Sequence, residues 1–204
     1  MIAPEDFNVS RETFERLEIY VELLRKWTPR INLVAKSTMP EVWERHIADS
    51  IQLLEVMAGR SGHYADLGSG GGLPGLVTAI AHTDFDMELN AVTLVESDQR
   101  KAAFLRTVLR ETESKGQVVA ARIEAIDPLS AEILSARALA SLDDLLGFAE
   151  QHLAKTGVAV FPKGINWRAE LEEAQKTFSF TCEAHKSQTQ DGAVILEIGE
   201  ISRV

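Results

Sequence analysis

The sequence is poor in the residues that build metal and redox centres. Its 204 residues include one cysteine, Cys182, and five scattered histidines, so an internal disulfide is excluded and no zinc-ligand set is expected. No apolar run approaches the roughly 18 residues needed to span a bilayer, and the first twenty residues lack the basic and apolar regions of a signal peptide. We therefore expect no metal, no membrane segment and a cytoplasmic location.

Positive charge is also scarce. The formal net charge is −10, which argues against indiscriminate binding to polyanions over the whole surface. Residues 25–46 are the exception, because five basic residues stand there against Glu41 and Glu44. A solvated helix surface is the ordinary interpretation of such a cluster, and a local RNA contact is the alternative. The five are Arg25, Lys26, Arg30, Lys36 and Arg45.

Low-complexity tracts and internal repeats are absent as well, and the composition is that of a folded, globular chain. Residues 10–29 show helical apolar spacing after the N-cap candidate Ser10, and Pro29 is expected to end this helix. A second helix is expected over residues 40–57, before the break at "RSGH". We predict an N-terminal helical extension over residues 1–60, packed on a domain of residues 61–204 as one structural unit, with a monomer as the default.

From Tyr64 onward, short apolar strands alternate with helical segments. Strands are expected at 64–67, 89–96, 118–122, 133–136 and 158–161, and helices at 74–81, 99–113, 142–154 and 167–177. This order predicts a mostly parallel sheet with helices on both faces. Two final strands in succession, 178–183 and 193–198, predict an antiparallel hairpin at one edge.

The stretch "YADLGSGGGLPG", residues 64–75, follows the first of these strands and forms a bare loop where ligands bind in such sheets. Two interpretations compete. "GGGLPG" matches the dinucleotide pattern G-x-G-x-x-G, but its first glycine, Gly70, lies three residues past the strand. Counted from Asp66, "DLGSGGG" instead gives D-x-G-x-G-x-G, which resembles the first motif of class I S-adenosylmethionine-dependent methyltransferases.

The chemistry of S-adenosylmethionine fits the residue types in and after this loop. Its sulfonium and ammonium groups favour a nearby carboxylate, which Asp66 supplies, beside the bare backbone at Gly68 and Gly70. Glu96, after the second strand, is a candidate for the ribose hydroxyls that either cofactor carries. After the third strand, Ile123 is a candidate for the adenine face, with core packing as the alternative, and Glu124 is a candidate for the adenine amine.

Several separated stretches agree with one family. In order they are "NL" at 32–33, "RHIADS" at 45–50, the glycine loop, "RIE" at 122–124, "SARA" at 135–138 and "KG" at 163–164. Together they resemble the bacterial small-subunit (16S) ribosomal RNA guanine-N7 methyltransferases, also called the glucose-inhibited division protein B family, over roughly residues 10–200.

The resemblance implies a Rossmann-like class I fold with a seven-stranded sheet, and methyl transfer from S-adenosylmethionine to N7 of one guanine in small-subunit ribosomal RNA. It also implies cofactor contacts at Gly68, Leu73, Ile123, Glu124 and Arg137. The chain departs from the family pattern at Glu96, where aspartate is frequent, and at Gly71, where proline is common. We expect the extra glycine only to loosen the loop.

Guanine N7 has a free lone pair and no proton to lose, so its methylation needs alignment and no general base. No catalytic residue is therefore assigned with certainty, and three residues are positioning candidates. Arg137 is a candidate for the methionine carboxylate, an RNA phosphate or guanine O6, with a pairing to a neighbouring acid as the structural alternative. Lys163 is a candidate for an RNA phosphate or is an exposed lysine without a role. His46, three residues before Asp49 on one helix, is expected to have a packing and lid role.

Two other functions stay open from the sequence alone. A non-catalytic RNA-binding or ribosome-assembly factor would keep the same nucleotide fold and the basic segment. An NAD-dependent dehydrogenase depends only on the weak "GGGLPG" match.

Overall fold

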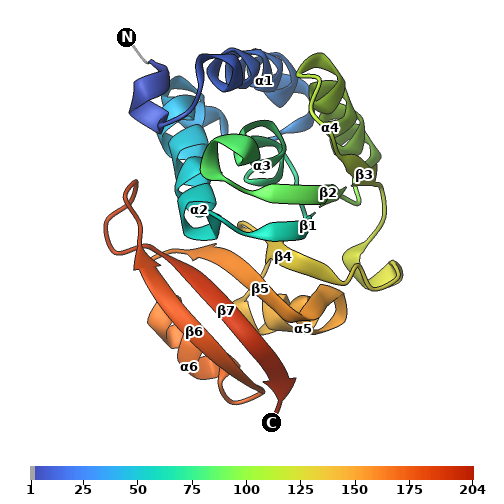
Figure 1. Cartoon of the computed structure of the whole chain (residues 1–204), viewed down its shortest axis with the longest axis vertical. Coiled ribbons are helices and arrows are strands. Elements are labelled where there is room, and N and C mark those ends of the chain that lie inside the picture. The colour runs from blue at the N-terminus through green and yellow to red at the C-terminus, as the bar shows by residue number, and fades with distance from the viewer. Residues whose placement is uncertain (1–2) are drawn as a thin grey trace.

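A seven-stranded sheet forms the centre of the computed structural model, which describes residues 3–204 (Figure 1). The strand order is β3-β2-β1-β4-β5-β7-β6. Strands β1 to β5 are parallel, whereas β7 is antiparallel to both β5 and β6. The predicted fold class and its antiparallel edge hairpin are thus confirmed. The strands are Ser61–Leu67 (β1), Glu88–Val95 (β2), Gln117–Val119 (β3), Ala131–Ser135 (β4), Leu153–Lys163 (β5), Phe178–Lys186 (β6) and Val194–Arg203 (β7).

Helices cover both faces of the sheet (Figure 1). One face carries α1 (Arg11–Ile31), α2 (Asp49–Met57), α3 (Gly75–Ala81) and α4 (Gln99–Glu111), which share one apolar core. The other face carries α5 (Leu142–His152) and α6 (Trp167–Ala174) over a second core. Short 3-10 helices complete the chain at Pro4–Phe7, Lys36–Glu41, His82–Phe85 and Ile123–Ala125.

The direction of strand order reverses at β1, which lies between β2 and β4. The loops after β1 and β4 therefore diverge at the carboxyl edge of the sheet, where doubly wound folds bind their ligands. The glycine loop follows β1, and the segment 136–141 follows β4. This topology brings together residues that are 70 positions apart in the sequence.

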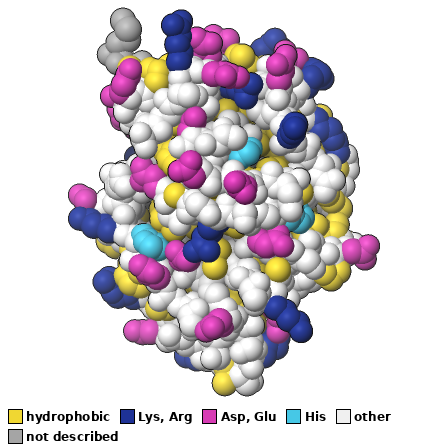
Figure 2. All heavy atoms as spheres, viewed as in Figure 1, with side chains coloured by type: hydrophobic (Ala, Val, Ile, Leu, Met, Phe, Trp, Pro, Cys, Tyr) yellow, Lys and Arg dark blue, Asp and Glu magenta, His cyan; other side chains and the backbone are white. Residues whose placement is uncertain are grey.

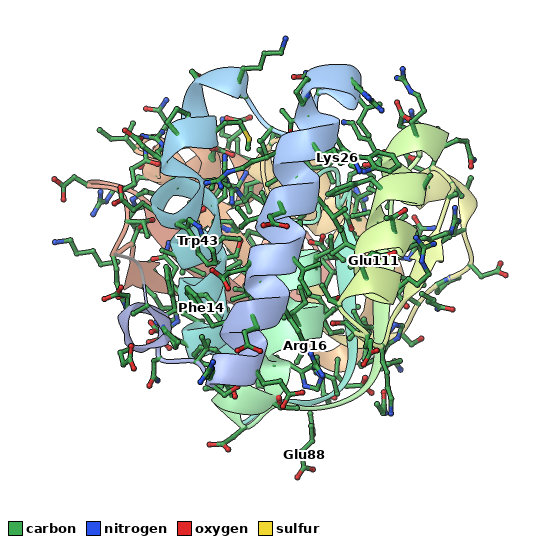
Figure 3. All side chains as sticks on the ribbon, turned by 90° about the horizontal axis from the view of Figure 1, so that it is seen from above. Phe14, Arg16, Lys26, Trp43, Glu88 and Glu111 are labelled. Carbon is green, nitrogen blue, oxygen red and sulfur yellow. The ribbon has the colours of Figure 1, made fainter. Side chains whose placement is uncertain are left out.

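The first helix is longer than predicted. Its N-cap is Ser10, as expected, but it continues past Pro29 to Ile31 and ends where Asn32 adopts a left-handed conformation. A proline in the last turn costs little because the helix ends shortly after it. On the side that faces the core, Phe14 stacks on Trp43 with the ring centroids 5.1 Å apart (Figure 3).

The second predicted helix is interrupted. Instead of one helix over residues 40–57, the chain forms the 3-10 helix Lys36–Glu41, a π-helix at Trp43–Ala48, and then α2. A π-helical turn shifts the register of the side chains, and such turns are frequent at functional sites. Here the turn includes Arg45, which is exposed, and His46, which is buried.

Residues 3–57 share their core with α3, α4 and the sheet, since Leu17, Tyr20 and Leu24 of α1 are completely buried. The division at residue 60 into an extension and a domain stays a prediction. Within residues 3–204, no helix combines the length and the apolar character that a membrane span requires. On the face drawn in Figure 2, acidic and basic side chains are distributed among small, separate hydrophobic areas.

Candidate functional site

Two cavities open side by side at the carboxyl edge of the sheet. The first, called the loop cavity below, has a volume of about 740 Å³ and is lined by the glycine loop and by residues that follow β2, β3 and β4. The second, called the outer cavity, has a volume of about 840 Å³ and lies between the His46 segment, α2, the end of β5 and the β6–β7 loop. Both volumes lie in the range of small-molecule sites. His46, Arg137, Ala138 and Ala140 line both cavities and so form a shared wall.

The loop cavity collects nearly all of the predicted cofactor residues. Seven of the eight candidates line it, and the exception is Asp66. The seven are Gly68, Gly70, Leu73, Glu96, Ile123, Glu124 and Arg137. Leu33, Val34 and Ala35 close one side of this cavity, which the sequence did not indicate beyond the "NL" motif.

The glycine loop needs glycine for its backbone geometry. Gly68 and Gly70 have φ angles of 66° and 54°, a region that side chains make costly. A β-carbon at Gly70 would meet only open space and the Gly68 carbonyl oxygen, 3.7 Å away. The Gly70 N–H donates to Glu96 Oε2 at 2.8 Å, and the Asp98 N–H donates to Glu96 Oε1 at 2.7 Å. Glu96 thus ties the loop to the end of β2 and keeps lone pairs for a ligand.

Gly71 packs tightly against two neighbouring segments, and the expectation that it loosens the loop stays a prediction. The Tyr20 hydroxyl of α1 donates to the Gly71 carbonyl oxygen at 2.6 Å. A β-carbon at Gly71 would lie 3.1 Å from the Leu33 carbonyl oxygen. The glycine therefore allows α1 and the following segment to pack closely on the loop and hold it in place.

Asp66 lies beneath the loop rather than on the cavity wall. Its side chain is 1% exposed, and its Oδ1 accepts a hydrogen bond from Ser135 Oγ at 2.7 Å. Since the Ser135 hydroxyl already donates its proton to Asp66, the Tyr64 hydroxyl, which lies 2.6 Å from Ser135 Oγ, must be the donor to Ser135. Burial is the main reason that the pKa of Asp66 rises to about 6, and the hydrogen bond from Ser135 opposes this rise.

The adenine candidates Ile123 and Glu124 stand in a 3-10 turn after a strand shorter than predicted. Ile123 is buried at the cavity, and its carbonyl oxygen lies 3.1 Å from Nε2 of the buried His152. Burial lowers the pKa of His152, so a neutral imidazole fixes this turn from α5. The Glu124 side chain is exposed and pairs with Arg122 at 3.2 Å. The contact of His152 with Ile123 was not predictable from the sequence, because α5 has the pattern of an ordinary amphipathic helix.

The shared wall is a hydrogen-bonded group around His46. Arg137 Nη2 lies 2.9 Å from His46 Nδ1, and Thr38 Oγ1 lies 2.7 Å from His46 Nε2. An arginine can only donate, so Nδ1 is the acceptor and the proton of the neutral ring sits on Nε2. Burial, and then the charge of Arg137, lower the pKa of His46 to about 4.

Arg137 is paired with an acid, as the structural alternative for this residue foresaw. Its Nη1 lies 3.2 Å from Oδ2 of Asp49. The Asp49 side chain also accepts hydrogen bonds from Gln52 Nε2 and Thr189 Oγ1, both at 2.8 Å. The β6–β7 loop and α2 are thereby connected to the wall between the cavities.

Lys163 is neither exposed nor free. It is 8% exposed, and its Nζ donates to the Ala140 carbonyl oxygen at 3.2 Å and to Glu170 Oε2 at 2.8 Å. The alternative of an exposed lysine without a role is therefore wrong, and the contact with an RNA phosphate stays a prediction. Glu170 of α6 neutralises the ammonium group at the outer cavity. Glu170 also accepts from the Leu142 N–H at 3.0 Å, so the pair holds both ends of the segment 140–142.

A possible metal-ligand group lies elsewhere. Glu183, His185 and Glu197 on β6 and β7 offer ligand atoms within 4.8 Å of one another, and Glu197 also forms an ion pair with Arg60. These side chains line neither cavity. The expectation that the function requires no metal stays a prediction.

Comparison with known proteins gives one consistent result. Residues 13–195 match the family model described as rRNA small subunit methyltransferase G. The chain is 50% identical to ribosomal RNA small subunit methyltransferase G of Ruegeria pomeroyi, with all of both chains covered. It is 50% identical to the protein of the same name from Paracoccus denitrificans, covering 94% of this chain and 96% of that one.

Solved structures show the same fold at low sequence identity. A ribosomal protein L11 methylase from Lactobacillus delbrueckii has a TM-score of 0.58 at 17% identity, covering 76% of this chain and 77% of that one. MtNAS in complex with S-adenosylmethionine has a TM-score of 0.60 at 14% identity, covering 90% of this chain and 74% of that one.

Proposed function

Since the chain belongs to the rRNA small subunit methyltransferase G family, we propose that it transfers a methyl group from S-adenosylmethionine to N7 of one guanine in small-subunit (16S) ribosomal RNA. The observation that carries the proposal is the pair of cavities with a shared wall. One cavity has the residues for the methyl donor, and the other adjoins it with room for a base.

The residues of the loop cavity fit S-adenosylmethionine. The backbone at Gly70 faces open space that a side chain would fill, whereas a β-carbon at Gly68 would lie 2.6 Å from Leu139 Cδ1. The cavity volume of about 740 Å³ suits a nucleoside ligand. Glu96 would accept from the ribose hydroxyls, and Ile123 would lie against the adenine, near Glu124. Gly68 and Leu73 would contact the methionine portion. Asp66 would act from below, where it attracts the cationic groups and holds Ser135.

When bound, the cofactor supplies an electrophilic methyl group on a sulfonium. The residues of this chain contribute alignment, because guanine N7 gives up no proton. His46 is neutral above a pH of about 4 and serves as the acceptor that orients Arg137. Arg137 is fixed at the boundary between the two cavities, where it is available to the methionine carboxylate or to the base. In the outer cavity, Asp49 and Glu170 balance the charges of Arg137 and Lys163, so these two cations do not oppose the positive charge that the purine acquires.

The RNA would approach the carboxyl edge over residues 25–46. Arg30, Lys36 and Arg45 are exposed there, and Thr38 and Arg45 line the outer cavity. A local patch of this kind lets an acidic protein bind RNA at one site while the rest of its surface repels polyanions. We place the reaction in the cytoplasm, carried out by a monomer.

The test is methyl transfer. The protein is incubated with labelled S-adenosylmethionine and small ribosomal subunits from a strain that lacks the corresponding gene, and the label is mapped along the RNA. The expected result is one labelled guanine, methylated at N7. Folded protein that binds the cofactor and leaves the RNA unlabelled contradicts the proposal.

A further inference from the structure

Ile165 is a large apolar side chain left in the open. It is 71% exposed, and it lies between β5 and α6 with the exposed Gly164 and Asn166 on either side. Among residues 3–204, the other large hydrophobic side chains that are at least about a third exposed are Ile19, Leu139 and the C-terminal Val204. An isolated surface isoleucine needs no explanation, so a function for Ile165 has to follow from its position.

That position is the rim of the outer cavity. The preceding residues Lys163 and Gly164 line the cavity. Across the rim, a β-carbon at Gly192 would lie 3.3 Å from Ile165 Cγ1, so Ile165 packs against the β6–β7 loop. Gln190 and Ala193 of the same loop also line the cavity. Ile165 is therefore held where two walls of the cavity meet, with most of its surface facing outward.

Exposed cations lie on α6, three residues after Ile165, and at the outer cavity. Arg168, exposed on the first turn of α6, lies over the Trp167 ring with its guanidinium 4.2 Å from the ring centroid. Arg45 is exposed and lines the same cavity. Proteins hold single-stranded RNA with aromatic side chains, on which bases stack, and with cations that pair with phosphates. Aliphatic side chains such as isoleucine act differently, as wedges inserted between base steps.

We propose that Ile165 is a wedge that stacks on the base next to the target guanine and fills the gap left when the guanine turns into the outer cavity. Enzymes that modify a base move it out of the stack, and apolar side chains inserted between base steps stabilise the opened strand. The inference depends on the proposed function. It adds an RNA contact between β5 and α6 to the one proposed for residues 25–46.

The experiment compares three variants on small ribosomal subunits. We expect Ile165→Ala to lower kcat/KM for the subunit by roughly five- to twentyfold, with unchanged affinity for S-adenosylmethionine by calorimetry. Ile165→Phe, which can still stack, should keep most of the wild-type value. Ile19→Ala removes an exposed isoleucine from α1 and should behave as the wild type.

Cofactor-free binding to the same subunits, measured by filter retention, separates this inference from the proposed function. Weaker binding by Ile165→Ala, restored in Ile165→Phe, supports the wedge even if no variant methylates. Equal kinetics and equal binding of Ile165→Ala and wild type overturn it. So does an Ile165→Phe variant that loses as much as Ile165→Ala, because that result indicates loss of local packing.

Discussion

At the scale of single residues, two buried groups at the site, Asp66 and His46, have pKa values that are shifted in favour of their uncharged forms. Burial raises the pKa of Asp66 to about 6 and lowers that of His46 to about 4. Both groups therefore titrate in the same acidic window, with opposite effects on stability.

The contribution of Asp66 to the free energy of unfolding decreases as the pH rises. Between its unfolded value of 3.8 and its folded value of about 6, the native state binds more protons than the unfolded state. The stabilisation that Asp66 provides is thus fully present below pH 3.8. It is lost as the pH rises through 6, and the free energy of unfolding falls by about 3 kcal/mol. Urea denaturation of wild type and Asp66→Asn at pH 4 and pH 7 measures this, because the variant lacks the titration. Parallel pH dependence of the two proteins contradicts it.

His46 gives the second prediction at this scale. Because its pKa lies near 4, the imidazole does not titrate near its usual value of 6.5, and no general base is required. The single-turnover rate of methyl transfer should be flat from pH 7 to pH 8, above the pKa of about 6 of Asp66, and any fall toward pH 6 should persist in His46→Ala. His46→Ala should lower this rate by about tenfold through loss of the acceptor for Arg137, a loss of about 1.4 kcal/mol. A step near pH 6.5 that disappears in the variant would show that His46 acts as a base.

At the scale of elements, α1 acts on the site from a distance in sequence. Tyr20, in the middle of α1, reaches the carbonyl oxygen of Gly71, and the chain after α1 supplies Leu33 to the loop cavity. The helical extension thus forms part of the cofactor site, although its amphipathic pattern indicates only packing.

Tyr20→Phe tests this connection. The variant leaves a buried carbonyl oxygen without its donor, which should cost about 1–3 kcal/mol in the free energy of unfolding and weaken S-adenosylmethionine binding severalfold. Thermal unfolding with and without the cofactor measures both. The matched control is Thr112→Val, which removes a buried hydroxyl that donates to the Val108 carbonyl oxygen in α4 and lines neither cavity. Equal loss of cofactor affinity in both variants would mean that the contact with Gly71 has no specific role.

Helices and strands were predictable where the periodicity of apolar residues agrees with the positions of glycine, proline and capping residues. The alternation of strands and helices from Tyr64 onward is confirmed, and its ends shift by a few residues. The π-helix at Trp43–Ala48 was not predictable, since a helical repeat carries no sign of a locally wider turn. β3 ends at Val119 and not at residue 122 as expected, since residues 120–122 lead into the 3-10 turn that begins at Ile123.

The candidate site was predictable to a similar extent. Backbone requirements mark Gly68 and Gly70 in the sequence, and topology alone places Glu96 and Arg137 at one edge. The partners of these residues could not be found, because Thr38, Ser135 and Glu170 are common polar residues whose role arises only from tertiary contacts.

At the scale of the whole molecule, charge is divided along α1, because all four of its glutamates lie in residues 11–22 and residues 25–30 carry only cations. Figure 3 shows Arg16 and Lys26 near opposite ends of this helix, and the end with Lys26 leads into the segment that lines the loop cavity. The double reversal Arg30→Glu with Lys36→Glu should lower kcat/KM for ribosomal subunits at least tenfold and flatten its salt dependence. Arg11→Glu with Arg16→Glu is the control at the other end. Equal effects of the two pairs would assign the loss to net charge alone.

The two parts of the chain should fold together. Removal of residues 1–60 would expose the apolar faces of α3 and α4 that α1 covers. We expect one cooperative unfolding transition for the full chain and no stable tertiary structure in the fragment 61–204, measured by calorimetry and near-ultraviolet circular dichroism. A fragment that unfolds cooperatively on its own would make the extension a separate domain.

The shared wall of His46, Arg137, Ala138 and Ala140 also has a consequence for inhibitor design. A single compound that joins an adenosine group to a purine by a short linker would cross this wall and occupy both cavities at once. Because the second group binds at a high effective concentration once the first is in place, such a compound should bind far more tightly than either half. Its selectivity would come from the spacing across the wall, which differs from the site of an enzyme that binds the cofactor alone.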